Sequence, residues 1–180
     1  MESVLIKKGF ELSESEIEQI NQAKAREFKA PPFNKRQLDE ALFFLLNDDL
    51  KVLAMGELIP VEPILFNGKA FSVLGIGGII ANEKGKGYGK KIMAAITNYL
   101  SECDKTGVGF CRIYNKGFYE KCGLKVNCDI LKRFVFKKEG EAIANRGDDC
   151  VIFSGGVDNF MKEVLANPNE DVILPREPDW

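Results

Sequence analysis

The stretch of this chain best suited to chemistry is a glycine- and lysine-rich turn between an apolar strand pattern and a helical pattern. It runs from Lys84 to Lys90 with the sequence KGKGYGK, and it follows a β-branched run that ends at Ile80. Glycines allow the backbone to approach a ligand closely and to point successive N–H groups at one anion. The start of the following helix adds about half a positive charge at the same place. The turn therefore predicts a pyrophosphate site in a nucleotide- or coenzyme-binding enzyme.

Composition limits the other kinds of site that the chain can contain. Its 180 residues suit one domain, and hydrophobic and charged fractions of 45% and 29% are ordinary for a soluble globular protein. A net charge of −2 indicates neither a nucleic-acid partner nor an anionic membrane. The chain has no histidine, which excludes a histidine base, a Ser-His or Cys-His nucleophilic site and a histidine-ligated metal. We expect no metal.

The location of the protein and the state of its thiols are also predictable. The longest apolar run, from Ala41 to Leu46, is too short to span a bilayer, and the N-terminus lacks the basic-then-apolar order of a signal peptide. We therefore expect a cytoplasmic protein. The number of cysteines is odd and none form a C-x-x-C pair, which favours free, mostly buried thiols. These cysteines are Cys103, Cys111, Cys122, Cys128 and Cys150.

The elements that must position the turn form a mixed α/β pattern. A capping box opens the first helix at Ser13, and Asn67-Gly68 is a hairpin signal. Glycines at 75, 77 and 78 indicate a bulge or a splayed strand end just before the turn. Expected strands are 4–10, 41–46, 50–66, 70–80, 108–111, 124–137, 151–154 and 172–174, and expected helices are 13–28, 35–39, 89–103, 116–122 and 158–165, with 140–149 a polar loop. We expect one domain over 1–180, with 141–180 a C-terminal appendix of unassigned role.

A second motif lies on the short helix after the next strand. It runs from Phe118 to Leu124 with the sequence FYEKCGL. Together the two motifs resemble the GCN5-related N-acetyltransferase superfamily, which carries Q/R-x-x-G-x-G/A at a strand-to-helix turn and then F-Y-x-K-x-G-F. Lys84 stands where the family prefers Arg or Gln. The resemblance implies the acyl-CoA N-acyltransferase fold: a mixed, mostly antiparallel central sheet with a splay after the fourth strand and helices on both faces.

The resemblance also implies a coenzyme, acetyl-CoA, and a set of residues that hold it. The pantetheine arm would pair with the bulged strand, where a free N–H polarises the thioester carbonyl, and Asn115 would contribute a further bond. Tyr119 would protonate the leaving thiolate, although a core tyrosine packed beside Phe118 is the alternative. The implied coenzyme-binding residues are Gly77, Gly78, Ile79, Lys84, Gly85, Lys86, Gly87, Tyr88, Gly89, Lys90 and Asn115.

The general base is left open by the sequence, because the strand before the turn contains no acid. The nearest acids are Glu57 and Glu62 on the preceding long strand. We take Glu62 as the catalytic candidate and interpret Glu57 as a solvated residue of a strand face. A mechanism with Tyr119, water and no dedicated base is the alternative. Cys122 is interpreted as a packing residue.

These residues predict an N-acetyltransferase that moves an acetyl group to a primary amine by direct attack in a ternary complex. We expect a small cationic acceptor; protein N-acetylation is one alternative, and a non-catalytic acyl-CoA sensor is another. A third is an interaction protein with a degenerate site. A homodimer is left open. The tail that ends at Trp180 is similar to that of aminoglycoside 2'-N-acetyltransferases, whose strand acid corresponds roughly to Gly75, and a frayed terminus is the alternative.

Overall fold

The computed structural model describes residues 3–49, 51–61, 63–138, 140–144 and 147–178, in two compact units. The first unit comprises Met1–Ile59 and Gly77–Asn98, and the second comprises Pro60–Ile76 and Tyr99–Trp180. Each unit is therefore discontinuous in sequence. The strand β6 and the helix α3 continue from one unit into the other along the chain. The expectation of a single domain stays a prediction.

The first unit is built on strands in the order β1-β2-β3-β6, in which β1, β2 and β3 are antiparallel neighbours. Residue 4 pairs with residue 46, and residue 42 pairs with residue 58. Its elements in chain order are β1 (Val4–Lys8), η1 (Gly9–Glu11), α1 (Glu14–Phe28), α2 (Lys35–Glu40), β2 (Leu42–Asp48), β3 (Lys51–Pro60), the second part of β6 (Leu74–Ala81) and most of α3 (Tyr88–Glu102).

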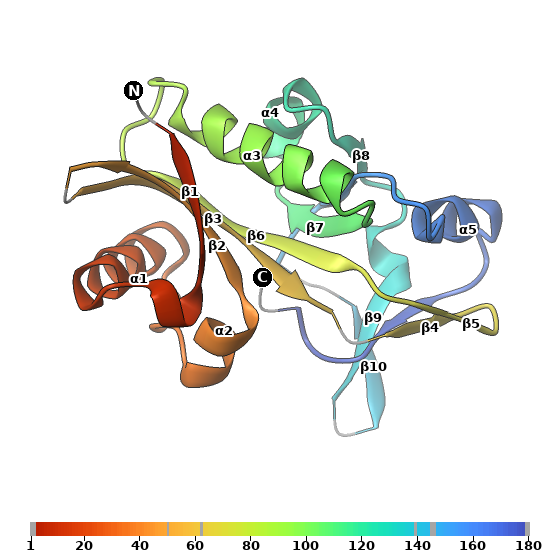
Figure 1. Cartoon of the computed structure of the whole chain (residues 1–180). Coiled ribbons are helices and arrows are strands. Elements are labelled where there is room, and N and C mark those ends of the chain that lie inside the picture. Colours follow the sequence, from red (N-terminus) through yellow and green to blue (C-terminus); the bar gives the residue numbers. More distant parts are fainter. Residues whose placement is uncertain (1–2, 50, 62, 139, 145–146, 179–180) are drawn as a thin grey trace. The chain divides into compact units, whose positions relative to one another are not determined.

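Local sequence explains where the helices of the first unit begin and what they cover. The predicted capping box is present, because the Ser13 side chain accepts a hydrogen bond from the Glu16 N–H and the Glu16 carboxylate accepts one from the Ser13 N–H. Figure 1 shows α1 and α3 on opposite faces of these strands. Gly56 of β3 allows α3 to approach, since a Cβ there would lie 2.7 Å from Ile92.

The second unit contains strands in the order β6-β7-β11-β8, a three-stranded sheet β10-β9-β12 and the hairpin β4–β5. The parallel pairing of β6 with β7 covers only residues 74–76 of β6, which agrees with a strand that splays afterwards. Its further elements are β4 (Ile64–Phe66), β5 (Lys69–Phe71), β7 (Gly107–Cys111), η2 (Ile113–Asn115), α4 (Lys116–Lys121), β8 (Lys125–Asn127), η3 (Leu131–Arg133), β9 (Phe134–Lys138), β10 (Glu141–Ala144), β11 (Cys150–Phe153), α5 (Phe160–Ala166) and β12 (Val172–Leu174).

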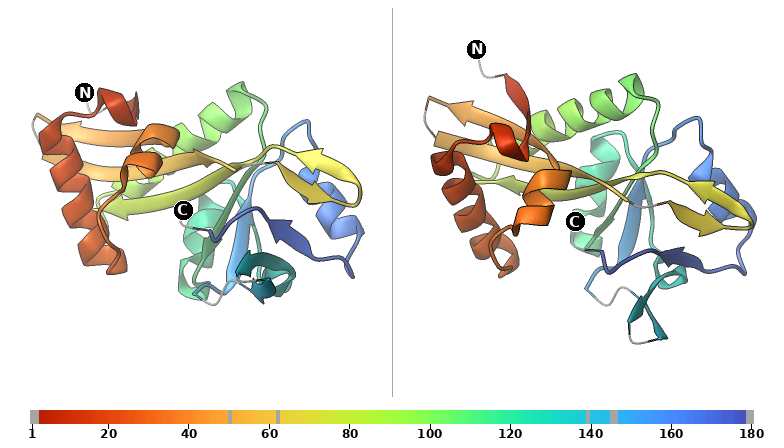
Figure 2. Two further views of the ribbon diagram at one scale, coloured as in Figure 1. Left: turned by 90° about the horizontal axis from the view of Figure 1, so that it is seen from below. Right: turned by 60° about the horizontal axis from the view of Figure 1, so that its bottom comes forward.

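An apolar cluster and a buried arginine hold the second unit together. Phe160 of α5 is fully buried, and its ring lies 6.5 Å from Phe66 and 5.2 Å from Phe71 of the hairpin. Figures 1 and 2 both show this hairpin beside α5. The buried Arg133 guanidinium donates to the carbonyls of Val164, Asn167 and Glu170. A cation suits this position because the carbonyls of a helix C-terminus carry partial negative charge.

The observed fold confirms the expected class and most of the elements. The Asn67-Gly68 turn is present, with both residues at positive φ. The predicted strand over 124–137 is wrong in its middle, because η3 interrupts it, and the predicted loop over 140–149 contains β10. β10 pairs with β9, the strand directly before it in the chain, so pairing in a hairpin overrides the polar composition of this segment. Among the described residues, no helix is long and apolar enough to cross a membrane.

One prediction about the cysteines is also wrong. Cys128 and Cys150 form a disulfide, with an S–S distance of 2.06 Å. The β8–β11 ladder explains the pairing, because Asn127 lies opposite Val151 and the two cysteines follow as the next opposed pair. Their separation of 22 residues carries no local signal, so the sequence could not indicate it. Free thiols are found at Cys103, which is exposed, Cys111, which is buried, and Cys122, which is half-buried.

Candidate functional site

The glycine turn lies entirely within the first unit and leads directly into α3. Gly85 and Gly87 have φ values of +81° and +80°, and apart from the adjacent residues no atom lies within 4 Å of a Cβ built at either position. These glycines are therefore required by the left-handed backbone and not by crowding. Gly87 accepts the first hydrogen bond of the helix from the Lys91 N–H, at 3.2 Å. The first N–H groups of a helix have no partner within the helix, so this end of α3 suits an anion.

Contacts with α1 and β3 hold the turn in place. The Lys84 ammonium binds the Glu27 carboxylate at 2.8 Å, and Arg26 donates to the Asn82 side chain. The Asn82 N–H donates to the Leu53 carbonyl at 2.9 Å. Lys84 is 70% exposed, so its pairing with Glu27 is weak and open to exchange with another anion. The start of the turn is thus anchored to α1 and β3, while its Lys84 ammonium stays exposed to solvent.

The two-glycine stretch before the turn packs against Glu57 of β3, whose predicted place on a solvated strand face is wrong. Gly78 has a φ of +60°, and a Cβ there would lie 2.9 Å from Oε1 of Glu57. Glu57 is only 2% exposed, so it is not a solvated residue of a strand face. β3 is buried on both faces, from Val52 to Ile59, and therefore has no solvated face. A single acid in an otherwise apolar run was the signal available in the sequence.

Tyr119 and its neighbours belong to the second unit. Tyr119 lies on α4 and is 9% exposed, and its ring contacts Phe118 edge-on at a centroid distance of 5.1 Å. Burial raises the pKa of Tyr119 well above its usual value, and the nearby Cys111, Asp148 and Cys122 add to the effect. The phenol therefore stays protonated near neutral pH and remains a hydrogen-bond donor. The same residue satisfies the packing alternative, so its role stays a prediction.

The thiol beside Tyr119 is also protonated near neutral pH. Burial raises the pKa of Cys111 to about 11, with a further contribution from Asp148 and Asp149. Because the thiolate is the reactive form of cysteine, this residue is a poor nucleophile. Asn115, the remaining predicted coenzyme ligand, closes η2 at the start of α4 and donates its N–H to the Arg112 carbonyl at 2.9 Å.

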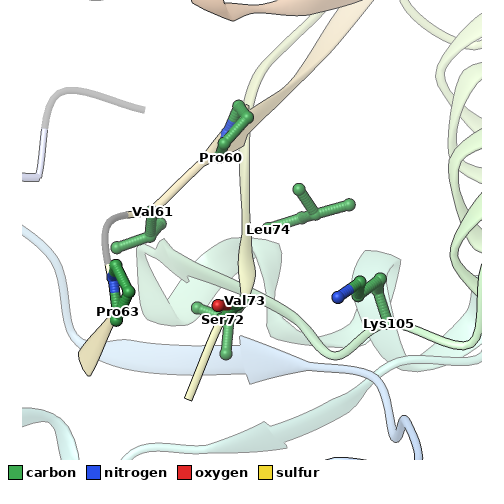
Figure 3. A pocket seen from close by; sticks show the side chains of 7 residues that line it. All are labelled: Pro60, Val61, Pro63, Ser72, Val73, Leu74 and Lys105. Atoms are coloured by element: carbon green, nitrogen blue, oxygen red, sulfur yellow. The ribbon is translucent and has the colours of Figure 1, made fainter. Parts of the chain in front are cut away.

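A cavity of about 290 Å³ opens in the second unit, and Figure 3 shows the side chains around it. The predicted base Glu62 lies outside the described residues, but both of its chain neighbours line this cavity. The walls are mostly apolar and carry one cation, which suits the apolar or anionic part of a ligand better than an ammonium group. The lining residues are Pro60, Val61, Pro63, Ser72, Val73, Leu74 and Lys105.

The predicted coenzyme residues are thus brought together in one unit, with a single exception. Gly77, Gly78 and Ile79 and the whole turn from Lys84 to Lys90 belong to the first unit, whereas Asn115 belongs to the second, with Tyr119. Within the described ranges, no group of three acidic, cysteine or histidine side chains is placed to hold a metal.

Comparison with known proteins identifies the fold. No family model matches the chain, and no curated protein is similar to it in sequence. Among solved structures, ElaA of Escherichia coli is 16% identical, with a TM-score of 0.60, over 85% of this chain and 99% of its own. An acyl-CoA N-acyltransferase from Pseudomonas aeruginosa is 16% identical, with a TM-score of 0.55, over 84% and 97%. An acetyltransferase of Bacillus subtilis, solved with CoA, is 13% identical, with a TM-score of 0.54, over 85% and 96%. The chain therefore has the acyl-CoA N-acyltransferase fold.

Proposed function

We propose that the protein is an acetyl-CoA-dependent N-acetyltransferase that acts on the primary amine of a small molecule. One observation carries the proposal: Gly85 and Gly87, both at positive φ, open the 15-residue helix α3 directly after the strand with the Gly77-Gly78 pair. The motif that resembles the superfamily therefore lies at a strand-to-helix turn of the same fold. The similar Bacillus subtilis structure contains CoA, which supports the coenzyme.

The residues of the first unit fit the charge and shape of a coenzyme. The backbone N–H groups of the turn and the start of α3 would receive the pyrophosphate, with Lys84, Lys86 and Lys90 as the nearby cations. The stretch from Gly77 to Ile79 would pair with the pantetheine arm as a neighbouring strand would. One of its N–H groups would bond the thioester oxygen, where negative charge develops during attack. Acetyl-CoA supplies the acetyl group in activated form.

The residues of the second unit would handle the leaving group. From its place in the second motif, Tyr119 donates a proton to the departing thiolate. Its raised pKa keeps that proton in place until the thiolate forms. The protonated Cys111 thiol argues against an acetyl-cysteine intermediate at that residue. This favours a mechanism in which the acetyl group moves directly from the thioester to the amine over one with an acetyl-enzyme intermediate.

The test is thiol release from acetyl-CoA in the presence of a panel of amines. The panel contains alkyl diamines and polyamines, amino sugars, free amino acids and peptides with a free N-terminus or lysine. We expect release above the rate without amine for at least one small cationic amine. Release only with peptides would favour protein N-acetylation. Release with none of them would contradict the proposed activity.

An acyl-CoA sensor without turnover is a second candidate, and the Lys84–Glu27 ion pair favours it. The superfamily motif carries Arg or Gln at this position, whereas Lys84 lacks a planar fork and binds a carboxylate of α1. Coenzyme binding that displaces Glu27 would change the contact between the turn and α1, which is the behaviour of a sensor. Binding of acetyl-CoA without thiol release for any amine would support this candidate.

A further inference from the structure

Two glutamates are buried among the residues of the first unit that the structure describes, Glu16 and Glu57. Glu16 is 8% exposed and belongs to the capping box of α1, where it accepts hydrogen bonds from Lys7, Ser13 and Asn47. Glu57 is 2% exposed and lies in the middle of β3, where no helix end or turn calls for a carboxylate. Burying a carboxylate in an otherwise apolar strand costs free energy. A role in the reaction would be one reason for a carboxylate at this position.

The neighbours of Glu57 define which face of the strands it occupies. Gly56 faces Ile92 and Ile96 of α3, and because side chains alternate along a strand, Glu57 faces the opposite way. Phe43 of β2 is its partner in the ladder and therefore shares its face. The Phe43 ring in turn packs edge-on against Phe33 of the α1–α2 connection, at 5.5 Å. Glu57 thus lies on the α1–α2 side of these strands.

Gly78 provides the space that the carboxylate occupies. Any side chain at position 78 would meet Glu57, since Oε1, Cδ and Cγ all lie within 3.2 Å of an ideal Cβ there. The φ of +60° at Gly78 moreover favours glycine. Gly78 is the central residue of the stretch assigned above to the pantetheine and the thioester. The Glu57 carboxylate therefore lies beside the backbone at which the acetyl group would be presented.

We infer that Glu57 is the proton acceptor of the reaction, an assignment that rests on the proposed function. An alkylammonium acceptor cannot attack until it loses a proton. In the inferred step one N–H bond of the ammonium breaks and its proton moves to a Glu57 oxygen, directly or through one water molecule. The products are a neutral amine and a carboxylic acid. The amine attacks the thioester carbon and the C–S bond breaks; the thiolate takes a proton from Tyr119, whose oxygen regains one from the nitrogen as the amide forms. The carboxylic acid returns its proton to solvent after transfer.

The test compares two acceptors in the parent and in the Glu57→Gln variant. The first is the alkylamine with the highest rate in the panel above, and the second is hydroxylamine, which is already uncharged near neutral pH. Glutamine keeps the size of the side chain but cannot take a proton. We expect the rate with the alkylamine to fall about 100-fold and the rate with hydroxylamine to fall less than about threefold. The alkylamine deficit should shrink as the pH rises and solvent deprotonates the amine.

Glu16→Gln is the matched control, because it neutralises the other buried glutamate of the same unit. It should lower thermal stability but leave the ratio of the two acceptor rates and the pH profile unchanged. Equal losses with both acceptors in Glu57→Gln, or no loss with either, would overturn the inference. If Glu57→Gln does not fold, Glu57→Asp is used instead, because it keeps the charge but moves the carboxylate one methylene further from Gly78. A loss that is selective for the alkylamine is again expected, and an unselective one would overturn the inference.

Two results separate failure of this inference from failure of the proposed function. If the parent releases thiol with an amine and Glu57→Gln retains the same acceptor ratio, only the role of Glu57 is wrong. If the parent binds no acetyl-CoA and releases no thiol, the proposed function itself fails, and with it the role of Glu57.

Discussion

The glycine turn of the first unit and the surroundings of Tyr119 in the second are built in opposite ways. The turn offers backbone N–H groups and exposed lysines, and its two left-handed glycines have no neighbouring atom that a Cβ would meet. Tyr119 is buried, with two thiols and a carboxylate acting on its pKa. An exposed backbone site suits the binding of a charged coenzyme, whereas a buried phenol suits one proton transfer. Binding and turnover should therefore respond to different substitutions.

The largest effect is expected at Tyr119. Tyr119→Phe removes the proposed donor to the thiolate and should lower turnover about 1,000-fold, or about 4 kcal/mol of transition-state stabilisation. The dissociation constant of acetyl-CoA should change less than about twofold, since the ring and its packing remain. Stopped-flow thiol release and calorimetric binding measure the two quantities. Unchanged turnover in a folded Tyr119→Phe protein would leave only the packing role.

The next effect concerns the stability of the second unit. Reduction of the Cys128–Cys150 disulfide, or the double substitution Cys128→Ser and Cys150→Ser, should lower the free energy of unfolding by about 3 kcal/mol. The expected decrease in Tm is roughly 6 to 12 °C. Scanning calorimetry with and without reductant checks it. Cys103→Ser is the control, because Cys103 is an exposed free thiol. Identical Tm values in both redox states would show that these two thiols are not bonded in solution.

Substitution in the turn should mainly change binding. Gly87→Val forces a β-branched residue into a left-handed conformation and places a side chain where the pyrophosphate would lie. We expect about tenfold weaker acetyl-CoA binding, or about 1.4 kcal/mol, and turnover within about twofold of the parent at saturating coenzyme.

Gly68→Val is the matched control for Gly87→Val. Gly68 has a φ of +74° and no atom within 4 Å of an ideal Cβ, and it lies in the β4–β5 hairpin of the other unit. This control should lower the free energy of unfolding to a similar extent and leave the affinity for acetyl-CoA unchanged. If both valine variants bound the coenzyme equally well, the turn could not be its site.

The smallest expected effect is on the pH dependence of the free energy of unfolding. It should differ between Glu16, a buried charge of the first unit, and Arg133, a buried charge of the second. Burial alone would raise the pKa of Glu16, but hydrogen bonds from Lys7, Ser13 and Asn47 lower it below its usual value. A carboxyl whose pKa is lower in the folded state stabilises the protein above its unfolded pKa, and this contribution is lost as the pH falls. Arg133 of the second unit is a buried cation held by backbone carbonyls and serves as the comparison.

Denaturant unfolding from neutral to acid pH tests the role of Glu16. Glu16→Gln should be less stable than the parent near neutral pH, and the difference should narrow toward acid pH. Arg133→Met should show a deficit with no such pH dependence. A gap between parent and Glu16→Gln that is constant with pH would contradict the lowered pKa.

The sequence predicted those parts of the molecule that depend on local signals. Three features depend on residues within a few positions of one another: the capping box at Ser13, the Asn67-Gly68 hairpin and the strand–turn–helix order around Lys84. Other features were not predictable in this way. The contact of Glu57 with Gly78 and the Cys128–Cys150 bond join residues that are distant in sequence, and the β9–β10 ladder contains residues with no clear strand pattern. These features depend on strand order and register, which cannot be read from a single sequence. Glu57 is the instructive case, because burial of β3 on both faces turned an expected surface residue into a candidate base.

Thermal unfolding of the parent protein with and without acetyl-CoA tests the central claim most directly. At a concentration about 100-fold above the dissociation constant, a ligand that binds only the folded state adds about 2.7 kcal/mol. We predict a clear rise in Tm with acetyl-CoA and a smaller rise in Gly87→Val at the same concentration. An unchanged Tm at millimolar acetyl-CoA, in a protein that unfolds cooperatively, would contradict the coenzyme site and leave a fold without that function.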